Sequence, residues 1–192
     1  MWSHDNFTVG QDGYNSPVPG SNYCDQQKAW ELLGTNMLDK SWKGLNVTMF
    51  AYGQTGSGKS YTMFGYGANR GVVPMAADRI FAKIKENKDP EVVYKVTVQM
   101  VEIYMEKIND LLIPKSQRGE PLKIREKQGD IYVEGVMQKP VENYEQIKQW
   151  IEFGDKNRAI DETAMNKTSS RSHTVFTIEI IKETNFQGKK SI

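Results

Sequence analysis

The chain has 192 residues, of which 38% are hydrophobic and 26% are charged, and its formal net charge is +1. This length suits about one globular domain, and this composition is that of a soluble protein with a substantial core. A nearly neutral chain has no global field that would favour nucleic acid or a membrane surface as its partner. The single cysteine, Cys24, excludes an internal disulfide framework, and no apolar run approaches the roughly 18 residues of a membrane helix.

The first third of the chain predicts a loop, a helix and a short strand. Residues 10–22 are rich in glycine and proline, which predicts a loop. Residues 25–42 have apolar side chains at helical spacing, with Asp25 as the expected N-cap and Gly44 as the stop. The run over residues 45–52 is short and mostly apolar, as in a buried strand of a parallel sheet. The predicted apolar side of the helix consists of Trp30, Leu33, Met37 and Leu38.

The next eight residues fit G-x-x-x-x-G-K-[ST], the pattern of a phosphate-binding loop. Glycines allow backbone turns that direct N–H groups into an anion site at a helix N-terminus. The lysine would reach the β- and γ-phosphates, and the serine hydroxyl would bind Mg²⁺. A glycine-rich surface turn is the alternative, but a predicted strand before the loop and a stretch without helix breakers after it favour phosphate binding. The predicted loop consists of Gly53, Gln54, Thr55, Gly56, Ser57, Gly58, Lys59 and Ser60.

The rest of the chain alternates between predicted helices and strands. The expected order is a helix from Pro74, a strand over 91–104, about one helical turn over 106–112, a hairpin of residues 122–125 and 131–136, a helix after Asn143 and a strand over 174–182. Asn143 followed by Gln146 resembles a capping box, and Ile147, Trp150 and Ile151 form the expected buried stripe of that helix. This alternation predicts an α/β fold with a largely parallel or mixed sheet and helices on both faces.

A second motif, Asn-Lys-Thr-Ser-Ser-Arg-Ser-His, occupies residues 166–173. Taken alone, a Ser/Thr-rich stretch between a helix and a strand is a polar loop. Beside a phosphate-binding loop, its amide and hydroxyls suit the sensing of a terminal phosphate and its Mg²⁺. Loops that order on such contacts and relax after hydrolysis are an established kind of switch.

Together these segments resemble the kinesin motor domain. The marks that carry the resemblance are Met-Phe-Ala-Tyr-Gly at 49–53, Tyr-Thr-Met-Phe-Gly at 61–65, Gly-Val-Val-Pro at 71–74, Glu-Ile-Tyr at 102–104, Asp-Leu-Leu at 110–112 and the switch motif at 166–173. The likeness runs from about Trp2 to Ile181, and the opening Trp-Ser-His also resembles the kinesin class that carries vesicle precursors. The resemblance implies a P-loop NTPase-type three-layer α/β sandwich with a mixed central sheet, as a single domain over residues 1–192.

The resemblance also implies a nucleotide site for ATP or ADP with Mg²⁺. Tyr61 matches a position near the adenine, where it would either stack on the base or pack on its own helix. Asn166, Ser169 and Ser170 would contact the γ-phosphate, the Mg²⁺ or the attacking water, and Arg171 would pair with a glutamate of a second switch. The expected metal ligands are Ser60 and Ser170. Arg158 would either brace this network or be a solvated helix charge.

The partner implied by the resemblance is the microtubule, which places the protein in the cytoplasm on the cytoskeleton. Residues 115–127 contain five basic and two acidic side chains, an excess that suits the acidic microtubule surface. They match the kinesin hairpin that touches β-tubulin, with Lys123, Arg125 and Lys127 as candidates. A solvated hairpin rim is the alternative. Nucleic acid is a poor candidate, because no array of base-stacking aromatics accompanies the patch, and no membrane contact is expected.

The boundaries of the chain shape a further expectation. The family's first strand would precede Trp2 and its second switch would follow Ile192, so we expect a kinesin-like fold that is incomplete at both ends. A kinesin-type ATPase is therefore predicted for the parent protein, and little activity for these residues alone. The alternative is a truncated nucleotide- or partner-binding module without ATPase activity. A small kinase or GTPase is disfavoured by the switch motif and by the lack of Asn-Lys-x-Asp.

Overall fold

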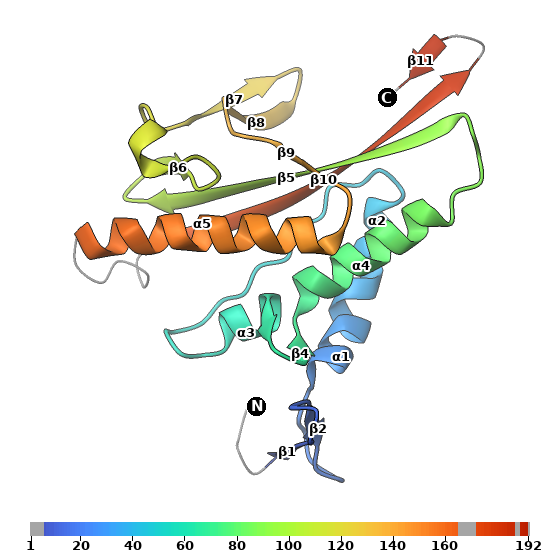
Figure 1. Cartoon of the computed structure of the whole chain (residues 1–192), viewed down its shortest axis with the longest axis vertical. Coiled ribbons are helices and arrows are strands. Elements are labelled where there is room, and N and C mark those ends of the chain that lie inside the picture. The colour runs from blue at the N-terminus through green and yellow to red at the C-terminus, as the bar shows by residue number, and fades with distance from the viewer. Residues whose placement is uncertain (1–5, 165–171, 187–188, 192) are drawn as a thin grey trace. The chain divides into compact units, whose positions relative to one another are not determined.

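The computed structural model describes residues 6–164, 172–186 and 189–191 (Figure 1). The chain divides into two compact units, residues 1–80 and 81–192. None of the described helices is both long and apolar enough to cross a membrane.

The first unit begins with a small antiparallel hairpin of β1 (Phe7–Val9) and β2 (Asn15–Pro17). The loop predicted over residues 10–22 is therefore interrupted, because residues 15–17 in its middle pair with the strand before it. Two further strands, β3 (Gly65–Tyr66) and β4 (Asn69–Arg70), form a second small hairpin ahead of helix α4 (Val72–Lys85). The helix predicted from Pro74 is confirmed and begins two residues earlier.

The helix predicted over residues 25–42 is confirmed, with one irregular turn. It runs through α1 (Gln26–Ala29), the π-helical turn η2 (Trp30–Gly34) and α2 (Thr35–Ser41). The Asp25 carboxylate accepts a hydrogen bond of 2.7 Å from the Lys28 N–H, as expected of an N-cap. Leu33 was expected in the core but is 55% exposed. The wide turn places Gly34 beneath the Trp30 ring instead, where a Cβ would collide with the indole.

The core of this unit gathers around the same indole. Buried Trp30 packs with Val72 and Ala76 of α4. The partly buried methionines and leucine that surround them are Met37, Leu38, Met49 and Met75. Two elements distant in sequence are thereby held together by apolar burial.

The strand predicted over residues 45–52 is wrong for this structure. These residues form no regular element, and Phe50 and Tyr52 are 81% and 95% exposed. A strand is held by ladder hydrogen bonds to a neighbouring strand, and no strand among the described residues pairs with this run. Helix α3 (Lys59–Met63) follows the glycine loop as predicted.

The second unit is built on an antiparallel sheet. Its order is β11-β10-β5-β6, and β9 also pairs with β5. The strands are β5 (Val92–Tyr104), β6 (Lys107–Asp110), β9 (Lys139–Val141), β10 (His173–Phe186) and β11 (Lys189–Ser191). The strands predicted over 91–104 and 174–182 are confirmed. Every strand pair in the described ranges is antiparallel, so the parallel pairing expected from the alternation of elements is not found there.

The helical turn predicted over residues 106–112 is wrong, because β6 is a strand that folds back on β5. Met105 and Glu106 both have positive φ, 48° and 62°, and make the tight two-residue turn that joins these strands. So short a connection permits only antiparallel pairing. On β5 itself the predicted alternation is confirmed, since Val96, Val98 and Met100 are buried on one face.

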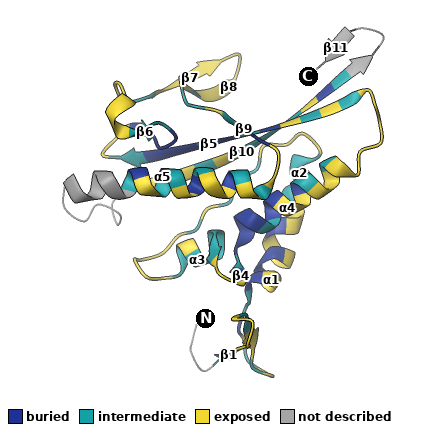
Figure 2. Ribbon diagram, in the orientation of Figure 1, coloured by how far each residue is buried: buried dark blue, intermediate teal, exposed yellow. Residues whose placement is uncertain are grey.

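Helix α5 (Tyr144–Ala164) lies along one face of this sheet (Figure 2). The predicted cap at Asn143 is confirmed, because its side-chain oxygen accepts a hydrogen bond of 3.0 Å from the Gln146 N–H. Ile147 and Ile151 are buried as expected, whereas Trp150 is half-buried. The ammonium of Lys139 on β9 lies 4.7 Å from the centre of the Trp150 ring, a cation–π contact that ties α5 to β9.

Candidate functional site

The glycine loop over residues 53–60 lies in the first unit and is mostly exposed. Gly56 and Gly58 have φ of 82° and 88°, which a residue with a Cβ adopts only under strain. Gly58 is also the N-cap of α3, so the helix begins directly at Lys59. The loop thus has the backbone that its sequence predicts, with left-handed residues leading into a helix N-terminus. This is the form in which backbone N–H groups can face an anion.

The Lys59 side chain folds back over this loop. Its ammonium donates hydrogen bonds of 2.9 Å to the carbonyl oxygens of both Gly53 and Gln54. The Ser57 N–H closes the loop from the other side through a bond of 3.2 Å to the Gln54 carbonyl. An ammonium has three donors, and these contacts use two. The lysine is therefore held at the loop, with capacity to bond an anion that settles there.

The residues around Ser60 fit a magnesium ion held through a nucleotide. Ser60 is exposed as the second residue of α3, so its hydroxyl is open to a ligand. Among the described residues, no group of three or more His, Cys, Asp or Glu side chains could hold a metal. Mg²⁺ prefers oxygen ligands and keeps several waters, and it is commonly bound by phosphates with few protein groups. One hydroxyl beside a phosphate loop matches that donor set.

Tyr61 is engaged by its own unit. Its hydroxyl accepts a hydrogen bond of 3.1 Å from the Asn15 amide, and its ring lies 6.2 Å from the ring of Tyr66. Burial and then a hydrogen bond with Tyr23 raise the pKa of Tyr61 to about 12. The Gln26 amide donates to the Tyr61 carbonyl at 2.5 Å. These contacts hold Tyr61 against β2, β3 and α1, and they fasten the start of α3 to those elements.

The predicted switch residues Asn166, Ser169, Ser170 and Arg171 lie outside the described residues. The segments on either side of them are joined by Arg158. Its guanidinium donates to the Thr174 hydroxyl at 3.0 Å and pairs with Asp155 at 3.6 Å. Arg158 therefore links α5 to the start of β10, which favours bracing over the solvated charge that was its alternative.

Asn157, next to Arg158, was missed by the sequence analysis. It is 6% exposed, and its side-chain amide donates to the carbonyls of Leu111 and Ile113 at 2.8 and 3.3 Å. The two neighbours thus attach α5 to the segment that follows β6 and to the start of β10. Asparagine is unfavourable inside a helix, so its presence in mid-helix was an available signal of a specific contact.

The candidate partner surface is the hairpin of β7 (Lys123–Lys127) and β8 (Asp130–Glu134), as predicted. Cross-strand pairing places Lys123 opposite Glu134 and Lys127 opposite Asp130. Arg125 also forms an ion pair of 2.9 Å with Glu134. The three cations therefore share one face with two carboxylates, and that face has a net charge of only +1. The excess counted along residues 115–127 overstated this charge, because the opposing carboxylates lie on the other strand.

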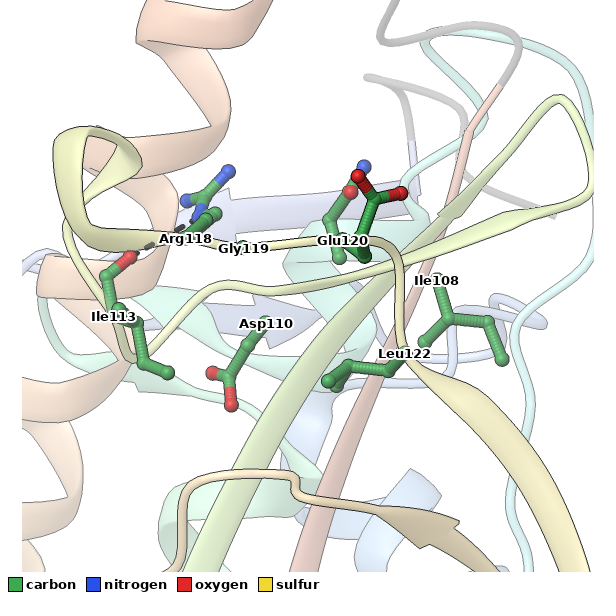
Figure 3. A pocket seen from close by; sticks show the side chains of 8 residues that line it. Ile108, Asp110, Ile113, Arg118, Gly119, Glu120 and Leu122 are labelled. Carbon is green, nitrogen blue, oxygen red and sulfur yellow. Dashed lines mark hydrogen bonds between the residues drawn. The ribbon is translucent and has the colours of Figure 1, made fainter.

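A small cavity of about 40 Å³ lies beside the base of this hairpin (Figure 3). It is far smaller than the roughly 300 Å³ or more of a usual ligand pocket. Its polar wall is Asp110, whose two carboxylate oxygens accept hydrogen bonds from the N–H groups of Leu112 and Met137 at 2.7 and 2.6 Å. Burial raises the pKa of this carboxyl, although both bonds act to lower it. Arg118, which also lines the cavity, donates to the Ile113 carbonyl at 3.1 Å. Asp110 thus joins the start of the segment that carries the hairpin, at Leu112, to its end, at Met137.

The sequence and the fold both match known proteins. The family model "Kinesin motor domain" matches residues 18–192. KIF28 of Mus musculus is 43% identical over 183 residues, covering 93% of this chain and 17% of that protein. KIF14 of Mus musculus is 43% identical over 160 residues, covering 81% of this chain and 10% of that protein. The chain thus spans less than a fifth of these relatives.

Solved kinesin structures resemble this chain in both fold and sequence. Residues 391–755 of KIF14, solved with ADP in complex with a microtubule, align with a TM-score of 0.75 at 42% identity, over 86% of this chain and 46% of that one. A fast kinesin aligns with a TM-score of 0.79 at 30% identity, over 99% of this chain and 55% of that one. The predicted fold class, an α/β fold of the kinesin-like P-loop NTPase type, is confirmed. The chain belongs to the kinesin motor domain family.

Proposed function

We propose that this chain supplies the nucleotide site and part of the track-binding surface of an ATP-driven microtubule motor. The observation that carries the proposal is the match of the kinesin motor domain model to residues 18–192. The left-handed glycines that lead into α3 support it independently, because they give the loop the backbone of a phosphate site. The alternative of a binding module without ATPase activity has no specific observation in its favour.

In this proposal the loop residues hold the phosphates of ATP or ADP. Lys59 lies against the loop carbonyls and reaches the β- and γ-phosphates with its remaining donor. Ser60 ligates the Mg²⁺, with Ser170 as the second protein ligand. The magnesium nucleotide supplies the phosphoanhydride bond and a cation that offsets its negative charge. The loop residues in this role are Gly53, Gln54, Thr55, Gly56, Ser57, Gly58, Lys59 and Ser60.

The segment over residues 166–173 senses the terminal phosphate. Asn166, Ser169 and Ser170 contact the γ-phosphate, the metal or the attacking water, and Arg171 pairs with a carboxylate of the second switch. Phosphoryl transfer of this kind depends on positioning and charge stabilisation, with no covalent intermediate on the protein. Tyr61 lies beside the adenine, where its ring packs against protein and base together.

The partner in this proposal is the microtubule, and the protein works on the cytoskeleton in the cytoplasm. The β7/β8 hairpin is the part of the described surface that we assign to this contact, with Lys123, Arg125 and Lys127 as its cations. They are exposed, and two of the three lie opposite a carboxylate. Their net attraction to an acidic surface is accordingly modest and falls with salt.

The ATPase rate of the full-length protein, with and without microtubules, tests the proposal. We expect a microtubule-stimulated rate that Lys59→Ala abolishes, because the loop then lacks its phosphate-binding cation. Lys40→Ala, at an exposed lysine of α2, is the matched control and should retain the rate. A protein that binds ATP but shows no stimulated turnover would instead be the module without ATPase activity.

A further inference from the structure

Helix α3 carries predicted phosphate-binding residues but has no core contact of its own to hold it in place. It has five residues, and none of them is buried. A helix of this length is not stable by itself in water. Its position is therefore set by contacts with the rest of the first unit. Lys59 and Ser60, at the start of the helix, depend on those contacts for their own positions.

The buried amide of Gln26 makes one of these contacts near the other end of α3. Gln26 is the first residue of α1 and is 1% exposed. Its NH₂ group donates to the carbonyl oxygen of Tyr61 at 2.5 Å and to that of Asn69 at 3.3 Å. Carbonyls in the last turn of a helix have no partner within the helix, and the Tyr61 carbonyl is one of them. One side chain thus satisfies the end of α3 and joins it to β4.

The elements that meet at this amide are closely packed. A Cβ on Gly65 would collide with the Asn69 carbonyl oxygen, and a Cβ on Gly71 would collide with the backbone of Met63. The backbone at the end of α3 therefore lies directly against β4, and α4 follows β4 at once. Helix α4 in turn packs on Trp30, which is one helical turn after Gln26. The amide accordingly connects α3 to the core of the first unit.

The oxygen of the same amide is left unsatisfied. The Gln26 Oε1 atom is buried and has no hydrogen-bond partner in the part of the chain that the structure describes. A buried acceptor without a partner lowers stability. A leucine here would remove that cost, but it would leave the Tyr61 carbonyl without this donor, which is a cost of similar size. Glutamine therefore adds little net stability at this position, and what it does provide is a fixed direction for α3.

We propose that Gln26 is a positioning residue for the phosphate-binding loop. Its NH₂ group holds the end of α3 against β4, so that Lys59 and Ser60 at the start of the helix meet the phosphates. This inference rests on the proposed function, which supplies the nucleotide as the ligand. A displacement of about 1 Å in such contacts can cost about 100-fold. We expect a smaller loss here, because the hydrogen bond from Asn15 to the Tyr61 hydroxyl still restrains the helix.

Two measurements on the full-length protein test this role: the dissociation constant of MgADP by calorimetry, and thermal unfolding without nucleotide. Gln26→Leu removes the donor, and we expect it to weaken MgADP binding about tenfold. Its Tm without nucleotide should stay within about 3 °C of the wild type, because the two costs offset each other. Gln27→Leu, at the exposed neighbouring position, is the matched control and should change neither quantity.

Gln26→Glu adds a readout that a purely structural role would not produce. An ionised carboxylate is only an acceptor, whereas the protonated form has one O–H to donate to the Tyr61 carbonyl. Burial raises the pKa of a carboxyl. MgADP binding should therefore be weaker than in the wild type at about pH 8 and should approach the wild type at about pH 6. The titratable groups nearby, Tyr23, Asp25 and Tyr61, are the same in both proteins, so the ratio of the two dissociation constants isolates the new carboxyl.

The outcomes separate this inference from the proposed function. Unchanged MgADP affinity in Gln26→Leu, or a Gln26→Glu ratio that does not narrow on acidification, overturns the inference and leaves the proposed function intact. A large loss of Tm in Gln26→Leu without nucleotide, or its failure to fold, also overturns the inference, since the amide would then be required for the fold itself. A wild-type protein that does not bind MgADP refutes the proposed function and this inference with it.

Discussion

Asp110 joins the two ends of the segment that carries the hairpin, and its replacement by asparagine gives a sharp test of that role. The carboxylate is 3% exposed and accepts N–H groups from Leu112 and from Met137, one on each oxygen. An asparagine has one acceptor oxygen and an NH₂ group, so one of these N–H groups would face a donor. Since the two N–H groups lie 25 residues apart in sequence, Asp110→Asn loosens one end of the segment.

The magnitude follows from two opposing terms. A buried N–H without a partner costs about 1–3 kcal/mol. Removal of the buried charge offsets part of this cost, since burial is what raises the pKa of Asp110. We expect a net loss of about 1–2 kcal/mol, which for a chain of this size lowers Tm by about 2–8 °C. Asp39→Asn, at an exposed position of α2, should change stability by less than about 0.5 kcal/mol.

Thermal unfolding measures the loss of stability, and amide hydrogen exchange shows which residues are loosened. Exchange at Leu112 or Met137 should accelerate in Asp110→Asn, while exchange in the first unit should not change. If Asp110→Asn is as stable as Asp39→Asn, or if its exchange is unaltered at both amides, Asp110 does not close this segment.

The same variant isolates a pH effect. A carboxyl whose pKa is raised by folding binds a proton more readily in the native state than in the unfolded state. Its contribution to stability is therefore fully present below the unfolded pKa and is lost as pH rises through the raised native pKa. The stability difference between the wild type and Asp110→Asn should accordingly grow on acidification. A difference that shrinks at acid pH would mean that the native pKa is lowered instead.

Three further predictions concern other contacts. Tyr61→Phe should cost about 1 kcal/mol for a lost hydrogen bond. In the wild type, spectroscopic titration should show the Tyr61 phenol half-ionised near pH 12, and the stability that it contributes should decline as pH rises above 10. Gly154→Ala should lower stability by about 1–2 kcal/mol in urea unfolding, because its Cβ would collide with the fully buried Met100 and overpacking outweighs the gain in helix propensity. Glu134→Gln should raise microtubule affinity about two- to fivefold at low salt by releasing Arg125, and should steepen the salt dependence; an unchanged affinity would mean that this cation is too far from the track to act.

Features encoded by neighbouring residues could be predicted from the sequence. The start of α3 at Lys59 follows from the glycines before it, and the caps at Asp25 and Asn143 follow from the short polar side chains there. The alternation along β5 follows from its own period of two. Each of these features depends on contacts between residues that are close in sequence, so a short stretch of sequence is enough to predict it.

Features that depend on a distant partner could not be predicted in the same way. An apolar run such as residues 45–52 is a strand only where another strand pairs with it, and none of those described does. Leu33 has the spacing of a core residue, but one π-helical turn places Gly34 there instead. The strand β6 was mistaken for a helical turn because only its pairing with β5 defines it. In each case a local pattern was compatible with two structures, and a contact elsewhere decided between them.

The β7/β8 hairpin combines both kinds of feature: its turn is set by neighbouring residues, but the charge of each face depends on the opposing strand. Gln128 and Gly129 both have positive φ, 55° and 89°, so a two-residue turn fixes the register from local sequence alone. Once the turn is placed, Lys127 must face Asp130, Arg125 must face Tyr132 and the isoleucines must lie on the other side. The net charge of a strand is therefore a poor guide to the charge of the surface it makes, because half of that surface comes from the opposing strand. The charge of a candidate docking surface on a hairpin is therefore better counted face by face than strand by strand.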